Sequence, residues 1–126
     1  MFVRKVSVRI KPNSLKQFTN LMESEVLPWL RMQEGFQDLI LLATTDGREI
    51  AALSFWDQKS NADMCDAQLY PRALKILEAL LDGTPYVKTF EVVSSTCRWH
   101  AIVLPLREDN AIQESGSAGW SAESFE

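Results

Sequence analysis

The sequence predicts one α+β domain, with its elements in the order strand, helix, strand, strand, helix, strand across residues 2–96. Two patterns support this prediction. Apolar residues alternate with polar ones in some segments and recur at helical spacing in others. In addition, residues 39–42 read Leu-Ile-Leu-Leu, so the second strand is apolar on both faces. Helices would cover one face of the sheet, and we expect a second copy of the chain to cover the other.

The first strand is predicted over residues 2–11, because apolar side chains stand at every second position there. Pro12 ends it, since proline cannot donate to a strand ladder. Asn13 or Ser14 can cap the helix that follows. Pro28 should kink this helix or start a second short one. The buried stripe of the helix is predicted to contain Leu15, Phe18, Leu21, Met22, Leu27 and Leu30.

The second and third strands are predicted over residues 36–44 and 49–56. Asp46 and Gly47 lie between them and indicate a hairpin, because both tolerate a positive φ. One face of the third strand would carry Ile50, Ala52, Ser54 and Trp56, and the other Ala51, Leu53 and Phe55.

Residues 59–81 are predicted to be mostly helical, with Pro71 dividing a short polar piece from a strongly apolar one. The turn at residues 82–85, Asp-Gly-Thr-Pro, ends this helix. The fourth strand is predicted over residues 86–96, and residues 97–106 alternate in a way that can extend it as a fifth strand.

The domain is therefore expected to span residues 1–106. Residues 107–126 are rich in serine, glycine and acidic residues and are predicted to form a polar, mobile tail. Trp120 and Phe125 are unusual in such a tail, and docking of these rings on the domain or on a partner is the alternative.

Composition excludes several classes of protein. The net charge of −4 argues against general nucleic-acid binding, which requires a basic surface. No apolar run is long enough to span a membrane, and the N-terminus lacks the order of a signal peptide, so a cytoplasmic location is predicted. Cys65 and Cys97 are predicted to be reduced and packed, and no spacing of cysteine and histidine indicates a metal site.

Three short segments, in this order and spacing, resemble a known family. Residues 34–36 read Glu-Gly-Phe before the second strand, where that family often has Pro-Gly-Phe. Residues 55–60 read Phe-Trp and then a polar stretch, and residues 82–85 read Asp-Gly-Thr-Pro before the fourth strand, where that family commonly has a Gly-Pro turn. With the element order, these segments resemble the antibiotic biosynthesis monooxygenase group of the dimeric α/β-barrel superfamily, over about residues 2–96.

This resemblance implies a ferredoxin-like antiparallel sheet, a homodimer packed sheet to sheet, and a pocket between each sheet and its helices. Some members of the family oxidise aromatic polyketides with oxygen and without metal or flavin, and others open the haem ring. The haem-degrading members use a strand-one asparagine, a strand-three tryptophan and a helix-two histidine. Trp56 matches that tryptophan, but the first strand offers Ser7 and residues 59–81 contain no histidine. Haem cleavage is therefore disfavoured, and no cofactor is expected.

The candidate ligand-pocket residues are Trp56, Phe36, Trp29 and Tyr70. Trp56 can stack on an aromatic substrate or serve as a core residue at a strand end. Trp29 and Phe36 can face the same pocket, although their spacing equally fits packing. Tyr70 and Tyr86 can donate a hydrogen bond to a substrate oxygen, as buried tyrosines also do structurally.

Other titratable residues are weaker candidates. Asp57, Asp63 and Asp66 can perform acid–base chemistry as a cluster, but interaction with the dipole at a helix start is the favoured interpretation. His100 is the single histidine, and its position favours an exposed or interface role. No catalytic residue is assigned.

The predicted function is a cofactor-independent monooxygenase acting on a small apolar aromatic compound. The alternative is a non-catalytic dimeric module of the same fold that binds a small apolar ligand or a protein. A third hypothesis is a structural dimer whose tail binds a partner.

Overall fold

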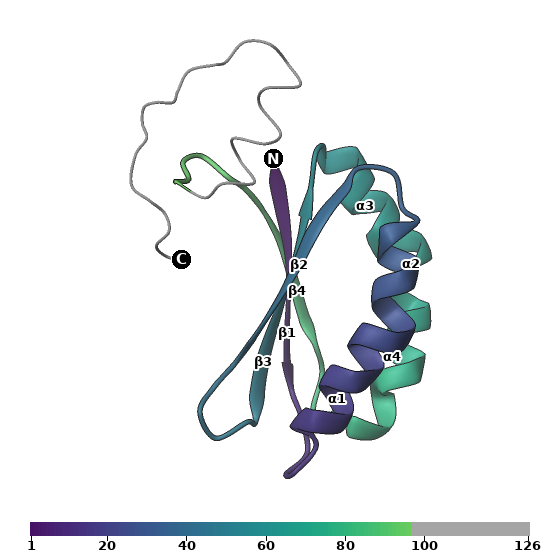
Figure 1. The fold of residues 1–126 in the computed structure, drawn as a ribbon, viewed down its shortest axis with the longest axis vertical. Helices are drawn as coiled ribbons and strands as arrows, with labels where there is room; N and C mark the ends of the chain where they lie inside the picture. Colours follow the sequence, from purple (N-terminus) through teal and green to yellow (C-terminus); the bar gives the residue numbers. More distant parts are fainter. Residues whose placement is uncertain (97–126) are drawn as a thin grey trace. The chain divides into compact units, whose positions relative to one another are not determined.

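Four antiparallel strands form one sheet, and the helices lie against one of its faces (Figure 1). The computed structural model describes residues 1–96, within which Met1–Glu91 form one compact unit. The strands are β1 (Phe2–Arg9), β2 (Phe36–Ala43), β3 (Glu49–Trp56) and β4 (Tyr86–Glu91). Their spatial order is β2–β3–β1–β4, with every neighbouring pair antiparallel. The ferredoxin-like α+β arrangement predicted from the sequence is therefore confirmed.

The first helical segment changes its winding midway. It consists of α1 (Leu15–Leu21), a π-helical turn η1 (Met22–Val26) and α2 (Leu27–Arg31). At the end of η1, the Leu27 N–H donates to the carbonyl of Met22, five residues back. Pro28 lies in the first turn of α2, where the missing N–H costs least. Val26 and Leu27 both keep right-handed helical φ and ψ values, so the helix is continuous here. The sequence predicts a kink or a new helix at Pro28, and the structure instead shows a change from π-helical to α-helical winding at Leu27.

The start of α1 differs in one detail from the prediction. Ser14 occupies the N-cap position, but its side chain makes no capping hydrogen bond. Its hydroxyl donates instead to the carbonyl of Pro12 at 3.4 Å. Asn13 has a φ of 59°, which turns the chain from β1 into the helix.

The second helical segment is divided in the predicted place. It consists of α3 (Lys59–Gln68), α4 (Tyr70–Leu77) and a 3₁₀ turn η2 (Glu78–Leu80). Pro71 lies in the first turn of α4. The chain then leaves the helix one residue earlier than predicted, because Leu81 pairs with Ile10 in an isolated bridge. None of the helices in residues 1–96 has the length and apolar character needed to cross a bilayer.

The hairpin between β2 and β3 forms at Asp46 and Gly47, as predicted. Gly47 has a φ of 70°, and its N–H donates to the carbonyl of Thr44 at 2.8 Å. The carboxylate of Asp46 accepts from the Thr44 hydroxyl at 2.6 Å and from the Arg48 N–H at 3.0 Å. These contacts satisfy the polar groups of the turn and set the register of the two strands.

β4 is shorter than predicted and ends at Glu91, not at residue 96. Glu91 pairs with Phe2, the first residue of β1, so the neighbouring strand offers no ladder beyond this point. Residues 92–96 therefore form no strand. The segment 97–126 lies outside the described residues, and with it the predicted fifth strand and tail, Cys97, His100, Trp120 and Phe125.

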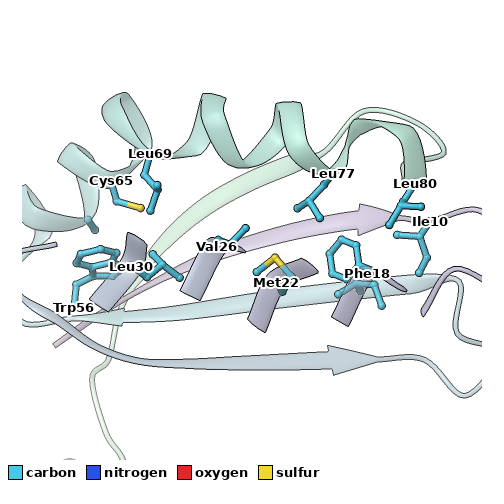
Figure 2. Packing of buried hydrophobic residues seen from close by; sticks show 12 residues of the cluster. Ile10, Phe18, Met22, Val26, Leu30, Trp56, Cys65, Leu69, Leu77 and Leu80 are labelled. Carbon is cyan, nitrogen blue, oxygen red and sulfur yellow. The ribbon is translucent and has the colours of Figure 1, made fainter. Parts of the chain in front are cut away.

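The hydrophobic core lies between the sheet and the helices (Figure 2). Trp56 stands at one end of it and Ile10 at the other, and both side chains are fully buried. The residues between them come from both layers: Phe18, Met22, Val26, Leu30, Ile50, Ala62, Cys65, Leu69, Leu77 and Leu80. The predicted stripe of the first helix thus supplies much of the helical side of this core.

The opposite face of the sheet, which we call the outer face, also carries large apolar side chains. Cross-strand pairing places Val3 with Phe90 and Phe55, and Ile40 with Leu53. Four side chains of this face keep substantial exposed fractions: Ile40 (36%), Leu42 (51%), Tyr86 (64%) and Phe90 (44%). β2 is therefore apolar on both faces, as the run at residues 39–42 indicates, whereas Lys5 of β1 and its partner Lys88 of β4 add charge to the outer face.

Candidate functional site

A small cavity of about 70 Å³ lies between the sheet and the helices. We call it the interior cavity. Side chains of β1, β2, β3, α1, α3 and α4 line it, and most of them are aliphatic or aromatic. Its polar or titratable lining residues are Arg4, Ser54, Cys65 and Tyr70. An apolar cavity with a few polar groups is the usual form of a small-molecule site, although such sites commonly occupy about 300–1,000 Å³.

Arg4 is the most unusual of these residues, because it is a cation with only 5% of its surface exposed. Its Nη2 donates to the Asp66 carboxylate at 2.7 Å. Its guanidinium carbon lies 4.4 Å from the centre of the Tyr70 ring, at cation–π distance. The buried charge thus has one anionic partner and one aromatic partner, both supplied by the second helical segment.

The Cys65 thiol and the Tyr70 phenol both stay protonated at neutral pH. Burial raises the pKa of the Cys65 thiol above its usual 9.0, although the Arg4 charge offsets part of this effect. Burial likewise raises the pKa of the Tyr70 phenol above 10.0, again partly offset by Arg4. Cys65, a free thiol, is therefore a poor nucleophile, and Tyr70 can act as a neutral hydrogen-bond donor.

Trp56 is held by a hydrogen bond and by an aromatic contact. Its indole N–H donates to the Ser54 hydroxyl at 2.9 Å, and the Ser54 hydroxyl in turn donates to the carbonyl of Arg4 at 3.4 Å. Its ring meets Phe36 edge to face, with centroids 5.5 Å apart. Two of the four predicted pocket residues, Trp56 and Phe36, are therefore in contact.

The other two predicted pocket residues lie apart from this pair. Tyr70 lines the interior cavity beneath Arg4. Trp29 packs against the edge of the core, and the guanidinium carbon of Arg72 lies 4.3 Å from its ring centre. The structure thus distributes the four residues between the cavity, the core and its edge.

A larger hollow of about 600 Å³ runs along the free edge of β2, between this strand and the first helical segment. We call it the β2 groove. Phe36 lines it, together with charged residues such as Glu23 and Arg31. Phe18 and Leu39 line both the β2 groove and the interior cavity, so these two side chains form the wall between them.

Asp57, Asp63 and Asp66 do not lie in the first turn of a helix, so the prediction that they are first-turn acids interacting with the helix dipole is wrong. The first turn of α3 contains no acidic residue. Instead, each carboxylate has its own partner. Asp57 accepts from Asn61 at 2.8 Å, Asp63 pairs with Lys59 at 3.0 Å, and Asp66 pairs with Arg4. The separate partners also leave no carboxylate pair for acid–base chemistry.

Ser7 lies on the outer face, where it pairs with Ala51 and Tyr86, and so it points away from the interior cavity. Within residues 1–96, no three histidine, cysteine, aspartate or glutamate side chains gather closely enough to hold a metal ion.

Arg4 is a site residue that the sequence motifs do not single out, although a signal for it exists. It occupies the same alternation as Val6, Val8 and Ile10, which places it on the buried face of β1. A charge at such a position requires a partner, and Asp66 is 62 residues away in the sequence. Only the folded chain identifies that partner.

Comparison of the sequence with protein-family models gives no match, and comparison with curated proteins gives none either. Solved structures do match. The fold is similar to that of a monooxygenase from the gene ActVA-Orf6 of Streptomyces coelicolor, solved in complex with nanaomycin D. The identity is 22%, the TM-score is 0.61, and the match covers 75% of this chain and 88% of that one.

Two further structures resemble the chain to a similar degree. SnoaB, a cofactor-independent oxygenase from Streptomyces nogalater, gives a TM-score of 0.63 at 17% identity, over 75% of this chain and 94% of that one. An antibiotic biosynthesis monooxygenase gives a TM-score of 0.60 at 17% identity, over 75% of this chain and 100% of that one. At such low sequence identities, structural similarity is evidence of a shared fold and not of a shared activity. The chain therefore has the fold of the antibiotic biosynthesis monooxygenases, as its sequence segments and element order predict.

Proposed function

We propose that this chain is a cofactor-independent monooxygenase that oxidises a small apolar aromatic compound, and that it works as a homodimer. The observation that supports this proposal best is the interior cavity, whose apolar wall carries a buried cation and a neutral phenol at one end. The fold adds support, because structural neighbours include a monooxygenase and a cofactor-independent oxygenase.

Such chemistry needs few catalytic side chains. An electron-rich aromatic substrate can supply electrons to oxygen itself. Conversion of a ring CH₂ group to a carbonyl consumes one O₂, places one oxygen atom on carbon and releases the other as water. No outside reductant is required. The protein would bind and orient the ring, exclude water and stabilise charge that develops on a substrate oxygen.

The size of the two hollows suggests how a ring would lie. The β2 groove has the volume of a typical small-molecule site, whereas the interior cavity accommodates only part of a ring system. The body of the substrate would occupy the groove against Phe36, and one end would reach the cavity past Phe18 and Leu39. Trp56 would support Phe36 from behind, Tyr70 would line the buried end, and Trp29 would border the site.

Oxygen uptake tests this proposal. Anthrone is a suitable probe because its central CH₂ group is activated by two rings. We expect one O₂ consumed for each anthraquinone formed, at a rate well above the spontaneous reaction and unchanged by a metal chelator. Phe36→Ala should lower the rate at least several-fold, whereas Met64→Ala, at a half-exposed position of α3, should not. Uptake equal to that of the buffer alone would refute the monooxygenase.

The homodimer is proposed to form through the outer face. Ile40 and Leu42 on β2 are exposed at one edge of this face, and Tyr86 and Phe90 on β4 are exposed at the other. Monomeric proteins rarely leave a continuous apolar patch of several hundred Å² in water. A second copy related by a two-fold axis would cover both patches at once, because the two contacting surfaces are then the same.

One observation at the same site supports a second function, which is binding of a small apolar ligand without catalysis. Cys65 and Tyr70 both remain protonated near neutral pH, so neither offers a general base. Quenching of tryptophan fluorescence by anthrone under nitrogen, without oxygen uptake in air, would select this function over the enzyme.

A further inference from the structure

One hydrogen-bond donor in the wall of the interior cavity is unused. The Nη2 of Arg4 donates to Asp66, and the guanidinium carbon lies over the Tyr70 ring. Its Nε is buried and has no acceptor among the described residues. Buried polar atoms of native proteins nearly always have a partner, so an unpaired N–H beside a cavity indicates that a water molecule or a ligand group accepts from it.

The nearby protein groups do not supply that acceptor. The Ser54 hydroxyl is already engaged by the indole N–H of Trp56 and by the carbonyl of Arg4. The remaining lining residues are almost all apolar, among them Val6, Leu39 and Leu69. The interior cavity, at about 70 Å³, has room for a polar group and a few carbon atoms.

The local charge decides what kind of acceptor fits. Arg4 already has an anionic partner in Asp66, and the two charges offset each other. Cys65 and Tyr70 are neutral near pH 7. No further positive charge faces the cavity from its lining residues, so an anion would enter an apolar site without a counter-charge of its own. A neutral oxygen acceptor avoids this cost.

We propose that the interior cavity binds the carbonyl oxygen of a neutral, apolar ketone or quinone, which accepts a hydrogen bond from the Arg4 Nε. This inference rests on the proposed function and deepens it, because it assigns the residue that recognises the ligand carbonyl at the same site. It is also a statement about binding alone, and so it can be tested without turnover.

The sheet provides a path for the rest of such a ligand. Leu39, Ser54 and Arg4 are cross-strand partners on β2, β3 and β1, so they form one row across the helix-covered face. Two strand spacings span about 10 Å, which is about the length of a fused ring system. The row begins at Leu39, in the wall shared with the β2 groove. The apolar body would extend toward the groove while the carbonyl faces Arg4.

Binding should be measured by tryptophan fluorescence under nitrogen with three matched probes. The probe 1-tetralone carries the carbonyl, tetralin has the same rings without it, and 1-naphthoate carries an anion. We expect 1-tetralone to bind about 10-fold or more tightly than tetralin, as for a hydrogen bond to a charged donor, and more tightly than 1-naphthoate. Equal affinities for 1-tetralone and tetralin, tighter binding of 1-naphthoate, or no binding of any probe would overturn the proposal.

Two substitutions assign the preference to Arg4. Arg4→Lys keeps a cation for Asp66 but removes the Nε donor, and Arg4→Met removes both. In each variant the affinity ratio of 1-tetralone to tetralin should fall to about 1, while tetralin binding stays within a few-fold. The ratio is informative even if a variant is less stable, since both probes are measured on the same folded protein. A ratio that survives in Arg4→Lys would contradict the assignment.

The result is separate from that of the oxygen assay. A carbonyl preference that depends on Arg4, without oxygen uptake from anthrone, would leave the binding site standing and refute the monooxygenase. Oxygen uptake without any carbonyl preference would support the monooxygenase and refute the carbonyl-binding role of Arg4.

Discussion

Arg4 of β1 and Asp66 of α3 form a 2.7 Å ion pair that joins the sheet to the helical layer, and their exposures are unequal: 6% of the Arg4 side chain and 53% of the Asp66 side chain. The arginine therefore depends on this contact more than the aspartate does. Without Asp66, the guanidinium would keep only the Tyr70 ring, whereas the aspartate alone would be solvated.

Asp66→Asn should destabilise the fold for this reason. We expect the free energy of unfolding to fall by about 1–3 kcal/mol, because the buried cation keeps at most a neutral acceptor in place of its anionic partner, while half of the aspartate is already in water. Urea denaturation measures the change. Asp63→Asn is the matched control, since its pair with Lys59 is exposed at both ends and should contribute less than about 0.5 kcal/mol. Equal effects of the two substitutions would contradict the structural role of the Arg4–Asp66 pair.

Trp56 and Ser54 should be energetically coupled. Ser54→Ala removes the acceptor of the buried indole N–H and should cost about 1–3 kcal/mol. In a chain that already carries Trp56→Phe, the same serine change should cost much less, because no N–H is left unpaired. A double-mutant cycle in urea measures the difference. Trp56→Ala should be the most harmful of the set, at about 3–5 kcal/mol. Additive effects of Ser54→Ala and Trp56→Phe would show that the hydrogen bond contributes nothing.

Gly35 is expected to tolerate no side chain. It has a φ of 82°, and a Cβ at this position would collide with Asp57 and Asn61. Gly35→Ala should therefore combine backbone strain with a steric clash and lower the free energy of unfolding by at least about 2 kcal/mol. Gly83→Ala separates the two effects, because Gly83 also has a positive φ, 114°, but a Cβ added there would meet no atom within 4 Å. Similar losses for the two variants would mean that the contact with Asp57 and Asn61 is easily relieved.

Alkaline pH should destabilise the protein through Cys65. Its folded-state pKa is raised above the usual 9.0 by burial, so the folded protein keeps this proton when the unfolded chain has released it. The contribution of Cys65 to the free energy of unfolding is fully present below pH 9.0 and is lost as the pH rises toward the folded-state pKa. Urea midpoints measured between about pH 7 and pH 11 should therefore fall above pH 9.0. The slope of this fall should be smaller in Cys65→Ala, and an identical slope would exclude Cys65 as its source.

The outer face should control assembly if the homodimer is correct. Light scattering at micromolar concentration should give the mass of two chains, and Leu42→Lys or Phe90→Lys should reduce it to one, because a buried charge without a partner opposes association. Met64→Lys is the control, since Met64 is as exposed as Leu42 but lies on α3. A monodisperse, stable monomer of the unsubstituted chain would refute the dimer.

Patterns among neighbouring residues were sufficient to predict most of the secondary structure. Alternation at Glu49–Trp56, the Asp46-Gly47 turn and the helix break at Pro71 are all properties of neighbouring residues, and each lies where the sequence predicts it. The element order was sufficient to predict the sheet, because short connections and alternating strands and helices leave few topologies.

The construction of the site depends on contacts between residues that are far apart in the sequence. β4 ends at Glu91 because its partner β1 begins at Phe2, and nothing near Glu91 in the sequence indicates that limit. The neighbours of Asp66 favour a role at a helix start, yet it pairs with Arg4, which those neighbours cannot reveal. Alternation indicates which residues face the interior, but it does not indicate which distant residue will meet a buried charge there. That choice depends on the packing of α3 against the sheet, and therefore on the whole fold.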